Sequence, residues 1–292
     1  MKGIILAGGA GSRLYPMTLV ASKQLQAVFD KPMIYYPLTT LLEAGIREIA
    51  LVSTPEDLPR FKKLFGDGSR LGASFTYFEQ PQPEGIPQAF LIAEPFIRGE
   101  SVALILGDNI FCGITGFTEA VRDFKQGAVN FGYYVNEPER YGVIAFDASG
   151  QATDIVEKPE KFISSYVLPG FYIYDAEVVE RTRALKPSKR GELEITDLSR
   201  SYMKDGKLKV KLLPRGVAWL DAGTPSAMHD AAAYIQTVEK RQGIKIGCPE
   251  EAAVEHGFVS QAQFEKMIGT LPRGEYRSYL ETVVQRKLRG SK

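Results

Sequence analysis

The stretch that most constrains this chain is its first 14 residues, MKGIILAGGAGSRL. Gly3–Ala7 is a short apolar run with β-branched residues, which predicts a buried strand of a parallel sheet. Gly8, Gly9 and Gly11 follow, and without a Cβ they let the backbone turn tightly and approach a ligand. Their N–H groups can converge on an anion, and the guanidinium of Arg13 suits phosphate oxygens. Open α/β sheets bind ligands at the carboxyl ends of their strands, so we expect a phosphate-binding loop here.

Two better-known glycine motifs do not fit this loop. The phosphate loop of the NTPases ends in Gly-Lys-Ser/Thr, but Arg13 and Leu14 occupy that place. The dinucleotide fingerprint G-x-G-x-x-G would begin at Gly9 and Gly11 and finds Leu14 at its third glycine. A dinucleotide oxidoreductase is therefore disfavoured. A plain glycine-rich turn from strand to helix stays open as the alternative, although Arg13 and Lys23 disfavour it.

Length, charge and cysteine content indicate the class of protein. A chain of 292 residues can bury a large core in one or two domains. The formal net charge is +1, so we expect neither nucleic acid nor an anionic membrane as a partner. Cys112 and Cys248 are the only cysteines and form no CxxC pattern, which predicts free thiols in a reducing, cytoplasmic setting. Ile4–Ala7 is too short for a signal peptide, and no apolar run approaches the roughly 20 residues of a membrane helix.

The order of apolar runs and helical patterns predicts the fold class. Through Leu106 the chain repeats strand, loop and helix, which predicts an α/β fold with a doubly wound, mainly parallel, Rossmann-like sheet. Closely spaced strand patterns then fill residues 128–220, one of them over Tyr166–Tyr174, and predict an inserted, partly antiparallel layer that could cover a site. The last residues are mainly helical and charged. We expect one α/β domain over 1–241, with the insertion inside it, and a C-terminal helical appendage over 242–292.

Two aspartates follow apolar segments at predicted strand ends. Asp108 comes just after Ser101–Leu106, and Asp221 lies in Trp219–Thr224, which we interpret as a second functional loop. Two carboxylates from separate strand ends suit Mg²⁺, a hard cation that takes oxygen ligands and completes its shell with phosphates and water. Asp also favours turns and helix caps for its own reasons, so a structural role is the alternative for each.

Other ionisable residues give weaker signals. Lys158 ends another predicted strand beside Glu157, and a solvated surface lysine is the ordinary alternative for it. His229 and His256 are the only histidines, and both fall in predicted helices away from the loops above. The sequence therefore disfavours a histidine triad, a histidine-ligated zinc and hydride transfer assisted by histidine.

Together these elements resemble one family. The loop Leu6–Leu14 matches the signature loop of the sugar-1-phosphate nucleotidyltransferases. Further segments are similar to the glucose-1-phosphate thymidylyltransferase branch of that family, and the likeness runs from Met1 to Glu251. Those segments are Lys31–Pro37, Gly107–Phe111, Pro138–Val143, Glu157–Pro159, Gly191–Asp197 and Trp219–Asp221. Each piece alone is weak, but the joint match is specific.

The resemblance implies a reaction in which dTTP and α-D-glucose 1-phosphate give dTDP-glucose and pyrophosphate, a first step towards dTDP-rhamnose or other dTDP-deoxysugars in polysaccharide biosynthesis. It also implies a homotetramer and Mg²⁺ held by Asp108 and Asp221. Catalytic roles fall to Arg13, Lys23, Asp108 and Lys158. The residues expected to bind the nucleotide are Leu6, Gly8, Gly9, Gly11, Ser12, Arg13, Lys23, Gln24, Gln80, Gly85 and Asp108, with Gln80 and Gly85 at the base. The residues expected to bind the sugar phosphate are Asn109, Tyr141, Gly142, Glu157, Lys158, Gly170 and Trp219.

The sequence departs from this branch at a few positions. Ser12 stands where threonine is usual and keeps the hydroxyl. Pro169 replaces a threonine that would face the sugar, and it lacks both a hydroxyl and an N–H. The same chemistry with UTP or with another hexose 1-phosphate therefore stays open. A non-catalytic regulator that binds nucleotide sugars is the alternative from another class, and the presence of Arg13, Lys158 and both aspartates disfavours it.

Overall fold

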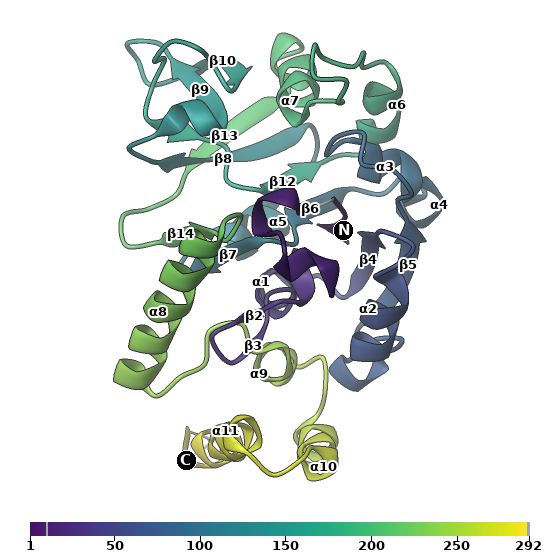
Figure 1. The fold of residues 1–292 in the computed structure, drawn as a ribbon, viewed down its shortest axis with the longest axis vertical. Coiled ribbons are helices and arrows are strands. Elements are labelled where there is room, and N and C mark those ends of the chain that lie inside the picture. The colour runs from purple at the N-terminus through teal and green to yellow at the C-terminus, as the bar shows by residue number, and fades with distance from the viewer. Residues whose placement is uncertain (10, 291–292) are drawn as a thin grey trace.

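The computed structural model describes residues 1–9 and 11–290, with side chains through Arg286. Ala10, inside the glycine motif, lies outside the described residues. In this part of the chain, ten strands join into one mixed sheet (Figure 1). None of its helices is both long and apolar enough to cross a membrane.

Four parallel strands form the centre of the sheet. In spatial order they are β6 (Val102–Leu106), β1 (Lys2–Ala7), β4 (Glu48–Ser53) and β5 (Ser74–Glu79). The chain winds outward from β1 to β5 and then returns to pair β6 with the other side of β1. The direction of winding thus reverses between β1 and β6, and open α/β sheets bind ligands at such a reversal. The doubly wound parallel sheet predicted from the sequence is confirmed.

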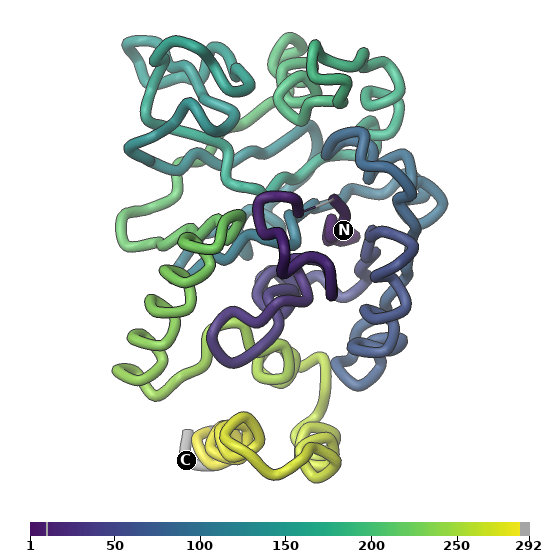
Figure 2. The backbone as a smooth tube through the Cα atoms, viewed as in Figure 1, coloured from purple at the N-terminus to yellow at the C-terminus, as the bar shows by residue number. Residues whose placement is uncertain are grey.

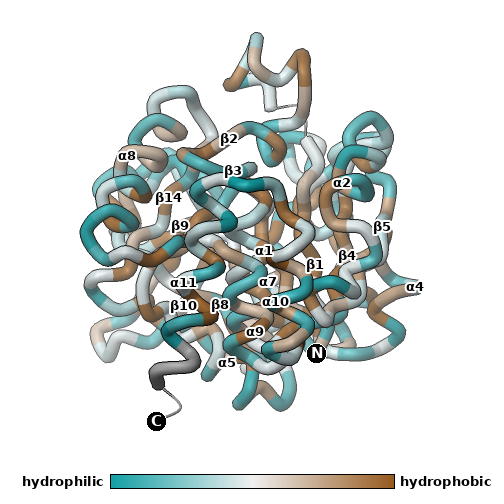
Figure 3. The backbone as a smooth tube through the Cα atoms, turned by 90° about the horizontal axis from the view of Figure 1, so that it is seen from below, coloured by the Kyte–Doolittle hydropathy of each residue, from teal (hydrophilic) through white to brown (hydrophobic). Residues whose placement is uncertain are grey.

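Helices cover both faces of the sheet because side chains along each strand alternate in direction. In β1, Ile5 packs into one hydrophobic cluster and Ile4 into the cluster on the opposite face. Figure 3 shows hydrophobic residues gathered in the interior around β1 and β4, with hydrophilic residues on the periphery. The first cluster is covered by α1 (Tyr35–Glu43), α2 (Leu58–Phe65), α5 (Phe117–Asp123), α9 (Pro249–Glu255), α10 (Gln261–Thr270) and α11 (Glu275–Gly290). The second is covered by α3 (Gln88–Ile92), α4 (Glu94–Ile97), α6 (Val178–Arg183) and α7 (Ile195–Lys204).

The strands of the predicted insertion continue the same sheet. β12 (Phe171–Tyr174) lies antiparallel to β6 on one side and to β8 (Ala128–Tyr134) on the other. The inserted strands are thus joined edge to edge to the parallel strands by β12, and their partly antiparallel character is confirmed. The remaining strands of this half are β9 (Gly142–Phe146), β10 (Ala152–Glu157), β11 (Tyr166–Val167) and β13 (Leu208–Leu212).

The single strand predicted over Tyr166–Tyr174 is divided in two, so that prediction is wrong. Pro169 lies between β11 and β12, and it has no N–H to donate to a strand ladder. β8 pairs with both halves, but the neighbour on the other side changes from β9 to β6 across this break. Val167 pairs with Tyr133 of β8, whereas Phe171 pairs with Ile105 of β6.

A separate two-stranded ribbon lies beside the sheet. β7 (Asn109–Cys112) and β14 (Ala218–Asp221) pair antiparallel, with Asp221 opposite Asn109. The predicted loop over Trp219–Thr224 is therefore wrong for its first three residues, which belong to a strand. Each strand has only four residues, and their pairing joins segments more than a hundred residues apart, so the local pattern does not reveal it.

The C-terminal segment is helical, as predicted, and packs on the N-terminal half. It follows α8 (Pro225–Gln242), and Figure 2 shows α10 and α11, in yellow, at the bottom of the view below α9. Ala253, Phe264 and Leu280 from its three helices are fully buried in the first hydrophobic cluster. The division into domains 1–241 and 242–292 stays a prediction.

The core around β12 allows a test of the packing. Phe171 is fully buried and its ring stacks on Phe117 at 4.1 Å between centroids. We expect Phe171→Ala to lower the free energy of unfolding by about 3–5 kcal/mol, because it removes a buried ring and leaves a cavity. Chemical denaturation measures this change. The matched control is Phe162→Ala: Phe162 is 74% exposed, so its substitution is expected to cost less than about 0.5 kcal/mol. Equal losses in the two variants would contradict this account of the core.

Candidate active site

The site begins where β1 and β6 end side by side. The glycine loop leaves β1 at Gly8, and Gly107 and Asp108 leave β6. The Gly107 N–H donates to the Leu6 carbonyl at 2.9 Å, and a Cβ at position 107 would lie 3.0 Å from that same oxygen. Glycine thus allows the two strand ends to approach closely. The reversal of the sheet therefore brings the predicted phosphate loop and the predicted metal ligand Asp108 together.

The loop after β5 is held against the glycine loop. Gln80 is 2% exposed, and a Cβ at Gly8 would lie only 2.0 Å from its Oε1. Further along, Gly85 has a φ of +108°, and a Cβ there would lie 2.0 Å from the carbonyl oxygen of Leu193. Both close approaches require glycine, so Gly8 and Gly85 are explained by the backbone geometry of the site.

The eleven residues expected to bind the nucleotide all line one cavity of about 470 Å³. They are Leu6, Gly8, Gly9, Gly11, Ser12, Arg13, Lys23, Gln24, Gln80, Gly85 and Asp108. Gln24 is 1% exposed, and within the described residues its Oε1 has no hydrogen-bond partner. A buried acceptor without a partner in the protein favours a ligand that donates to it.

The seven residues expected to bind the sugar phosphate all line a second cavity, of about 780 Å³. They are Asn109, Tyr141, Gly142, Glu157, Lys158, Gly170 and Trp219. Asp221 lines this cavity as well, and Ser12, Arg13 and Asp108 line both cavities. The two cavities therefore meet at the glycine loop and the first aspartate.

The two aspartates have different electrostatic surroundings. Burial would raise the pKa of Asp108, but its ion pair with Lys23 and a hydrogen bond from the Asn109 amide hold that pKa below its usual value. Burial is the main cause that raises the pKa of Asp221, and the negative charge of Asp108 is the next. The positive charge of Arg13 opposes this shift but does not cancel it. Lys23 thus favours the ionised form of Asp108, whereas burial and the charge of Asp108 disfavour the ionised form of Asp221.

The donor set of this pair suits a hard divalent cation. Within residues 1–9 and 11–290, no three His, Cys, Asp or Glu side chains form a ready-made metal cage. A cation here would need further oxygens from a substrate and from water, which is how Mg²⁺ is usually held beside phosphates. A carboxylate has about four lone-pair sites, so Asp108 can keep its bonds to Lys23 and Asn109 and still ligate a cation.

A chain of hydrogen bonds from β14 orients the first aspartate. The indole N–H of Trp219 donates to Asn109 Oδ1, and Asn109 Nδ2 donates to Asp108 Oδ1 at 2.9 Å. The indole can only donate, so the direction of the Asn109 amide follows from it. The Tyr141 ring packs on Trp219 at 5.1 Å, and its hydroxyl donates to Asp221 Oδ2 at 3.4 Å. Residues predicted to touch the sugar thus also position both carboxylates.

Lys158 stands out by its backbone conformation. Its φ is +40°, in the left-handed region, which costs energy for a residue with a Cβ. Its N–H donates to the Tyr141 carbonyl at 3.0 Å, and its side chain, half exposed, lines the second cavity. A strained backbone at a cavity-lining lysine favours a functional role over the solvated-surface alternative.

Sequence reasoning missed several charged residues that line the site, among them Arg140, Arg190 and Glu192. Arg190 donates to Glu192 at 2.8 Å and to Glu157 at 3.4 Å. Arg190 directly precedes the segment Gly191–Asp197, which carries part of the family resemblance. Its position beside that motif is the sequence feature that could have indicated a place in the site.

The residues that sequence reasoning set aside lie outside the site. His229 and His256 are exposed and line neither cavity. Cys112 and Cys248 are free and buried, as predicted. Burial raises the pKa of the Cys112 thiol to about 12, so this thiol stays protonated near neutral pH.

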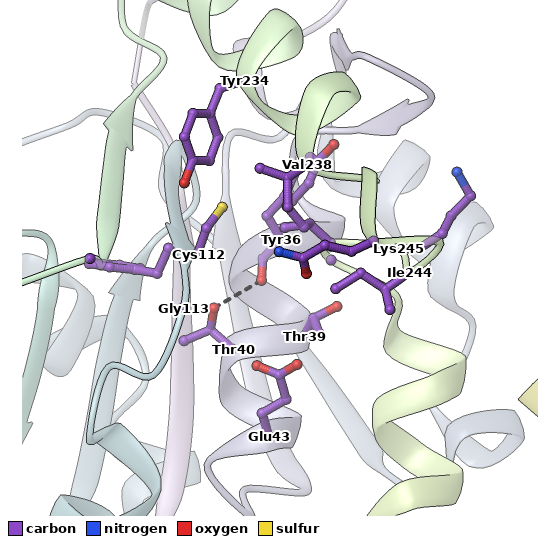
Figure 4. Close-up of a pocket in the computed structure, with 15 residues that line it drawn as sticks. Tyr36, Thr39, Thr40, Glu43, Cys112, Gly113, Tyr234, Val238, Ile244 and Lys245 are labelled. Atoms are coloured by element: carbon purple, nitrogen blue, oxygen red, sulfur yellow. Dashed lines mark hydrogen bonds between the residues drawn. The ribbon is translucent and has the colours of Figure 1, made fainter. Parts of the chain in front are cut away.

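A third cavity, of about 320 Å³, lies apart from the other two and shares no lining residue with them. Figure 4 shows how α1, the end of β7 and α8 enclose it. Residues labelled there include Tyr36, Thr40 and Glu43 from α1, Cys112 and Gly113 at β7, and Tyr234 and Val238 from α8. The candidate active site therefore consists of the first two cavities.

Comparison with known proteins identifies the family. The nucleotidyl transferase family matches residues 2–238 of this chain. A glucose-1-phosphate thymidylyltransferase of Xanthomonas campestris pv. campestris (strain B100) is 49% identical over 288 residues, which are 98% of this chain and 97% of that protein. The chain belongs to the glucose-1-phosphate thymidylyltransferase family of nucleotidyl transferases. The family that the sequence motifs resemble is confirmed, and its members are enzymes.

Solved structures share the fold of this family member. A Bacillus anthracis protein in complex with a sucrose is 40% identical, with a TM-score of 0.74 over 80% of this chain and 94% of that chain. A UDP-glucose pyrophosphorylase complexed with UDP-glucose is 25% identical, with a TM-score of 0.71 over 81% of this chain and 98% of that chain. The α/β fold class predicted from the sequence is thereby confirmed.

The hydrogen bond from Trp219 to Asn109 leads to a prediction. Trp219→Phe keeps an aromatic ring but removes the N–H, which leaves the nearly buried Asn109 oxygen without its donor. An unsatisfied buried polar group costs about 1–3 kcal/mol of stability, so we expect the thermal transition to fall by a few degrees. We also expect kcat/KM for nucleotidyl transfer to fall about tenfold or more, because Asn109 is no longer held in the direction that orients Asp108. Steady-state kinetics and thermal unfolding measure the two quantities. Wild-type kcat/KM in this variant would show that the Trp219 N–H does not position the site.

Proposed function

We propose that the protein transfers dTMP from dTTP to α-D-glucose 1-phosphate, giving dTDP-glucose and pyrophosphate. The observation that carries this proposal is the meeting of the two cavities at Ser12, Arg13 and Asp108. A nucleoside triphosphate in the first cavity and a sugar phosphate in the second would bring their phosphates together there. The name of the 49% identical relative supports these two substrates.

The charges of the site support a direct transfer. A phosphate oxygen of glucose 1-phosphate attacks the α-phosphorus of dTTP, and the bond from that phosphorus to the pyrophosphate oxygen breaks. Lys23 lines the nucleotide cavity, Lys158 and Arg190 line the sugar cavity, and Arg13 lines both. Such a reaction depends mainly on positioning and charge neutralisation.

No strong general base is required for this transfer. A phosphate monoester loses its second proton near pH ~6, so the attacking oxygen already carries negative charge at neutral pH. Within the described part of the chain, neither histidine nor cysteine lines the two cavities. The composition of the site therefore agrees with a phosphate nucleophile that needs no deprotonation.

Mg²⁺ is the cofactor that we propose, with Asp108 and Asp221 as its protein ligands. When bound there, it would neutralise charge on the phosphates during transfer. Tyr141 and Asn109 would keep the two carboxylates in place through the hydrogen bonds described above.

Several finer assignments stay predictions. UTP and another hexose 1-phosphate remain the alternative substrates, since Pro169 lies directly before Gly170 at the sugar cavity. The homotetramer and a downstream dTDP-rhamnose or dTDP-deoxysugar pathway are expected from the resemblance alone, and the cytoplasmic setting is expected from the cysteine content.

A substrate panel tests the proposed function. Pyrophosphate release and nucleotide-sugar formation are measured for dTTP, UTP, CTP, ATP and GTP against several hexose 1-phosphates. We expect dTTP with glucose 1-phosphate to have the highest kcat/KM, UTP to follow, and CTP and the purine nucleotides to be poor. One methyl group separates thymine from uracil, and a hydrophobic pocket resolves it by only about 1–3 kcal/mol. A higher kcat/KM with ATP, GTP or CTP than with both dTTP and UTP would refute the proposal.

The metal assignment has its own prediction. Asp221→Asn keeps the size of the side chain but removes its charge, so we expect weaker Mg²⁺ activation and a turnover lower by orders of magnitude, with the fold retained. Mg²⁺ titrations of the rate and Mn²⁺ binding in the presence of dTTP measure the effect. Asp230→Asn, at an exposed position of α8, is the charge-matched control. Near-normal turnover of Asp221→Asn at low Mg²⁺ would remove Asp221 from the metal site.

A further inference from the structure

The amide of Gln80 is held by a short chain of side chains behind the nucleotide cavity. Gln80 Nε2 donates to Gln88 Oε1 at 2.6 Å, and Gln88 Nε2 donates to Glu84 Oε2 at 2.9 Å. The backbone N–H of Glu84 donates to the same Gln88 Oε1, at 3.0 Å. Gln88 is the first residue of α3 and does not line the cavity. The chain therefore reaches the site only through Gln80.

The chemistry of Glu84 determines the direction of this chain. A carboxylate can only accept a hydrogen bond, and a backbone N–H can only donate one. Gln88 must therefore turn its NH₂ towards the carboxylate and its oxygen towards the N–H. That oxygen also meets Gln80, which must turn its NH₂ towards Gln88. Reversing either amide would place like atoms against each other and leave partners unpaired.

Glu84 itself is held by the segment on the far side of the cavity. The Leu193 N–H donates to the Glu84 carbonyl at 2.8 Å, and the next residue, Gly85, forms a parallel bridge with Leu193. The Glu84 N–H that donates to Gln88 thus belongs to a paired backbone segment, whereas the Glu84 carboxylate is exposed. The fixed backbone donor therefore sets the direction of the Gln88 amide, and through it that of Gln80.

The free end of the chain is an acceptor at the nucleotide cavity. Gln80 Oε1 lies against Gly8, and both residues line that cavity. The Gln80 Nε2 is the atom turned away to Gln88, which leaves the oxygen as the atom of this amide that lies beside the glycine loop. A ligand with an N–H at this point would satisfy the oxygen.

We propose that Gln88 is a specificity-determining positioning residue, which keeps the Gln80 acceptor turned towards the base through the chain Glu84–Gln88–Gln80. This inference rests on the proposed function and deepens it. Thymine and uracil carry an N–H at position 3, in the middle of their pairing edge, and match an acceptor. Cytosine carries an unprotonated nitrogen there, so two acceptors would face each other. Gln88 thus helps to reject cytosine without touching the nucleotide.

The test compares kcat/KM for dTTP and dCTP, which differ at the pairing edge and in the methyl group. Gln88→Met removes the acceptor that holds the Gln80 NH₂, so the Gln80 amide can rotate and present its NH₂ to cytosine. We expect the dTTP to dCTP ratio of kcat/KM to fall about tenfold or more. Gln82→Met is the matched control, since Gln82 is exposed in the same loop and does not line the cavity, and it is expected to keep the wild-type ratio.

A double variant tests whether the direction of these hydrogen bonds matters, rather than the packing of the side chains alone. Glu84→Gln with Gln88→Glu exchanges the two groups, so residue 88 still accepts from Gln80 and residue 84 now donates to it. We expect this variant to keep the dTTP to dCTP ratio close to the wild-type value. If Gln88→Met lowers kcat/KM equally for dTTP and dCTP, so that their ratio is unchanged, Gln88 has a structural role and the inference is overturned. A low dTTP to dCTP ratio in the double variant would also overturn it. The proposed function is judged separately, by whether the wild-type protein forms dTDP-glucose.

Discussion

The ion pair between Lys23 and Asp108 is the interaction on which the rest of the site depends. It joins the segment after the glycine loop to the end of β6, and both side chains are largely buried. Burying two charges costs solvation free energy that their attraction does not reliably offset, so such a pair is weak evidence for a stabilising role. Its position at the reversal of the sheet gives it a different purpose. It places a fixed cation and a fixed carboxylate where the two substrate cavities meet.

The surrounding residues keep this arrangement rigid before any substrate arrives. Asp108 is oriented by Asn109 and Trp219, and Asp221 by Tyr141. On the sugar side, Arg190 bridges Glu157 and Glu192, while burial and the charge of Glu194 raise the pKa of Glu157. Preorganised charges cost no reorganisation during the reaction, which is why a site for two polyanions gains from them. The same principle extends to the base contact that we propose for Gln80, whose amide donates to Gln88.

The fold, and most of the residues that line the candidate site, could be predicted from the sequence. The physical reasons differ from residue to residue. The apolar runs of β1, β4 and β6 are strong local signals, and glycines such as Gly8 and Gly85 reflect close backbone approaches that only glycine tolerates. What the sequence could not reveal depends on partners far along the chain. The pairing of β7 with β14 and the joining of β12 to β6 are such cases. Gln88 and Arg190 were missed for another reason. Their partners Gln80, Glu84 and Glu192 are near in the sequence, but the residue types alone do not show which side chains form hydrogen bonds.

The central claim is that phosphate attacks phosphate directly, held by charges at the junction of the two cavities. The stereochemical course at the α-phosphorus tests it most directly. One diastereomer of dTTP carrying sulfur on the α-phosphate is reacted with glucose 1-phosphate, and the configuration of the thio-substituted dTDP-glucose is determined by ³¹P NMR. A single in-line displacement predicts inversion. Retention would require two displacements through a covalent nucleotidyl-protein intermediate, with a group such as Lys158 or Ser12 as nucleophile, and would contradict the account.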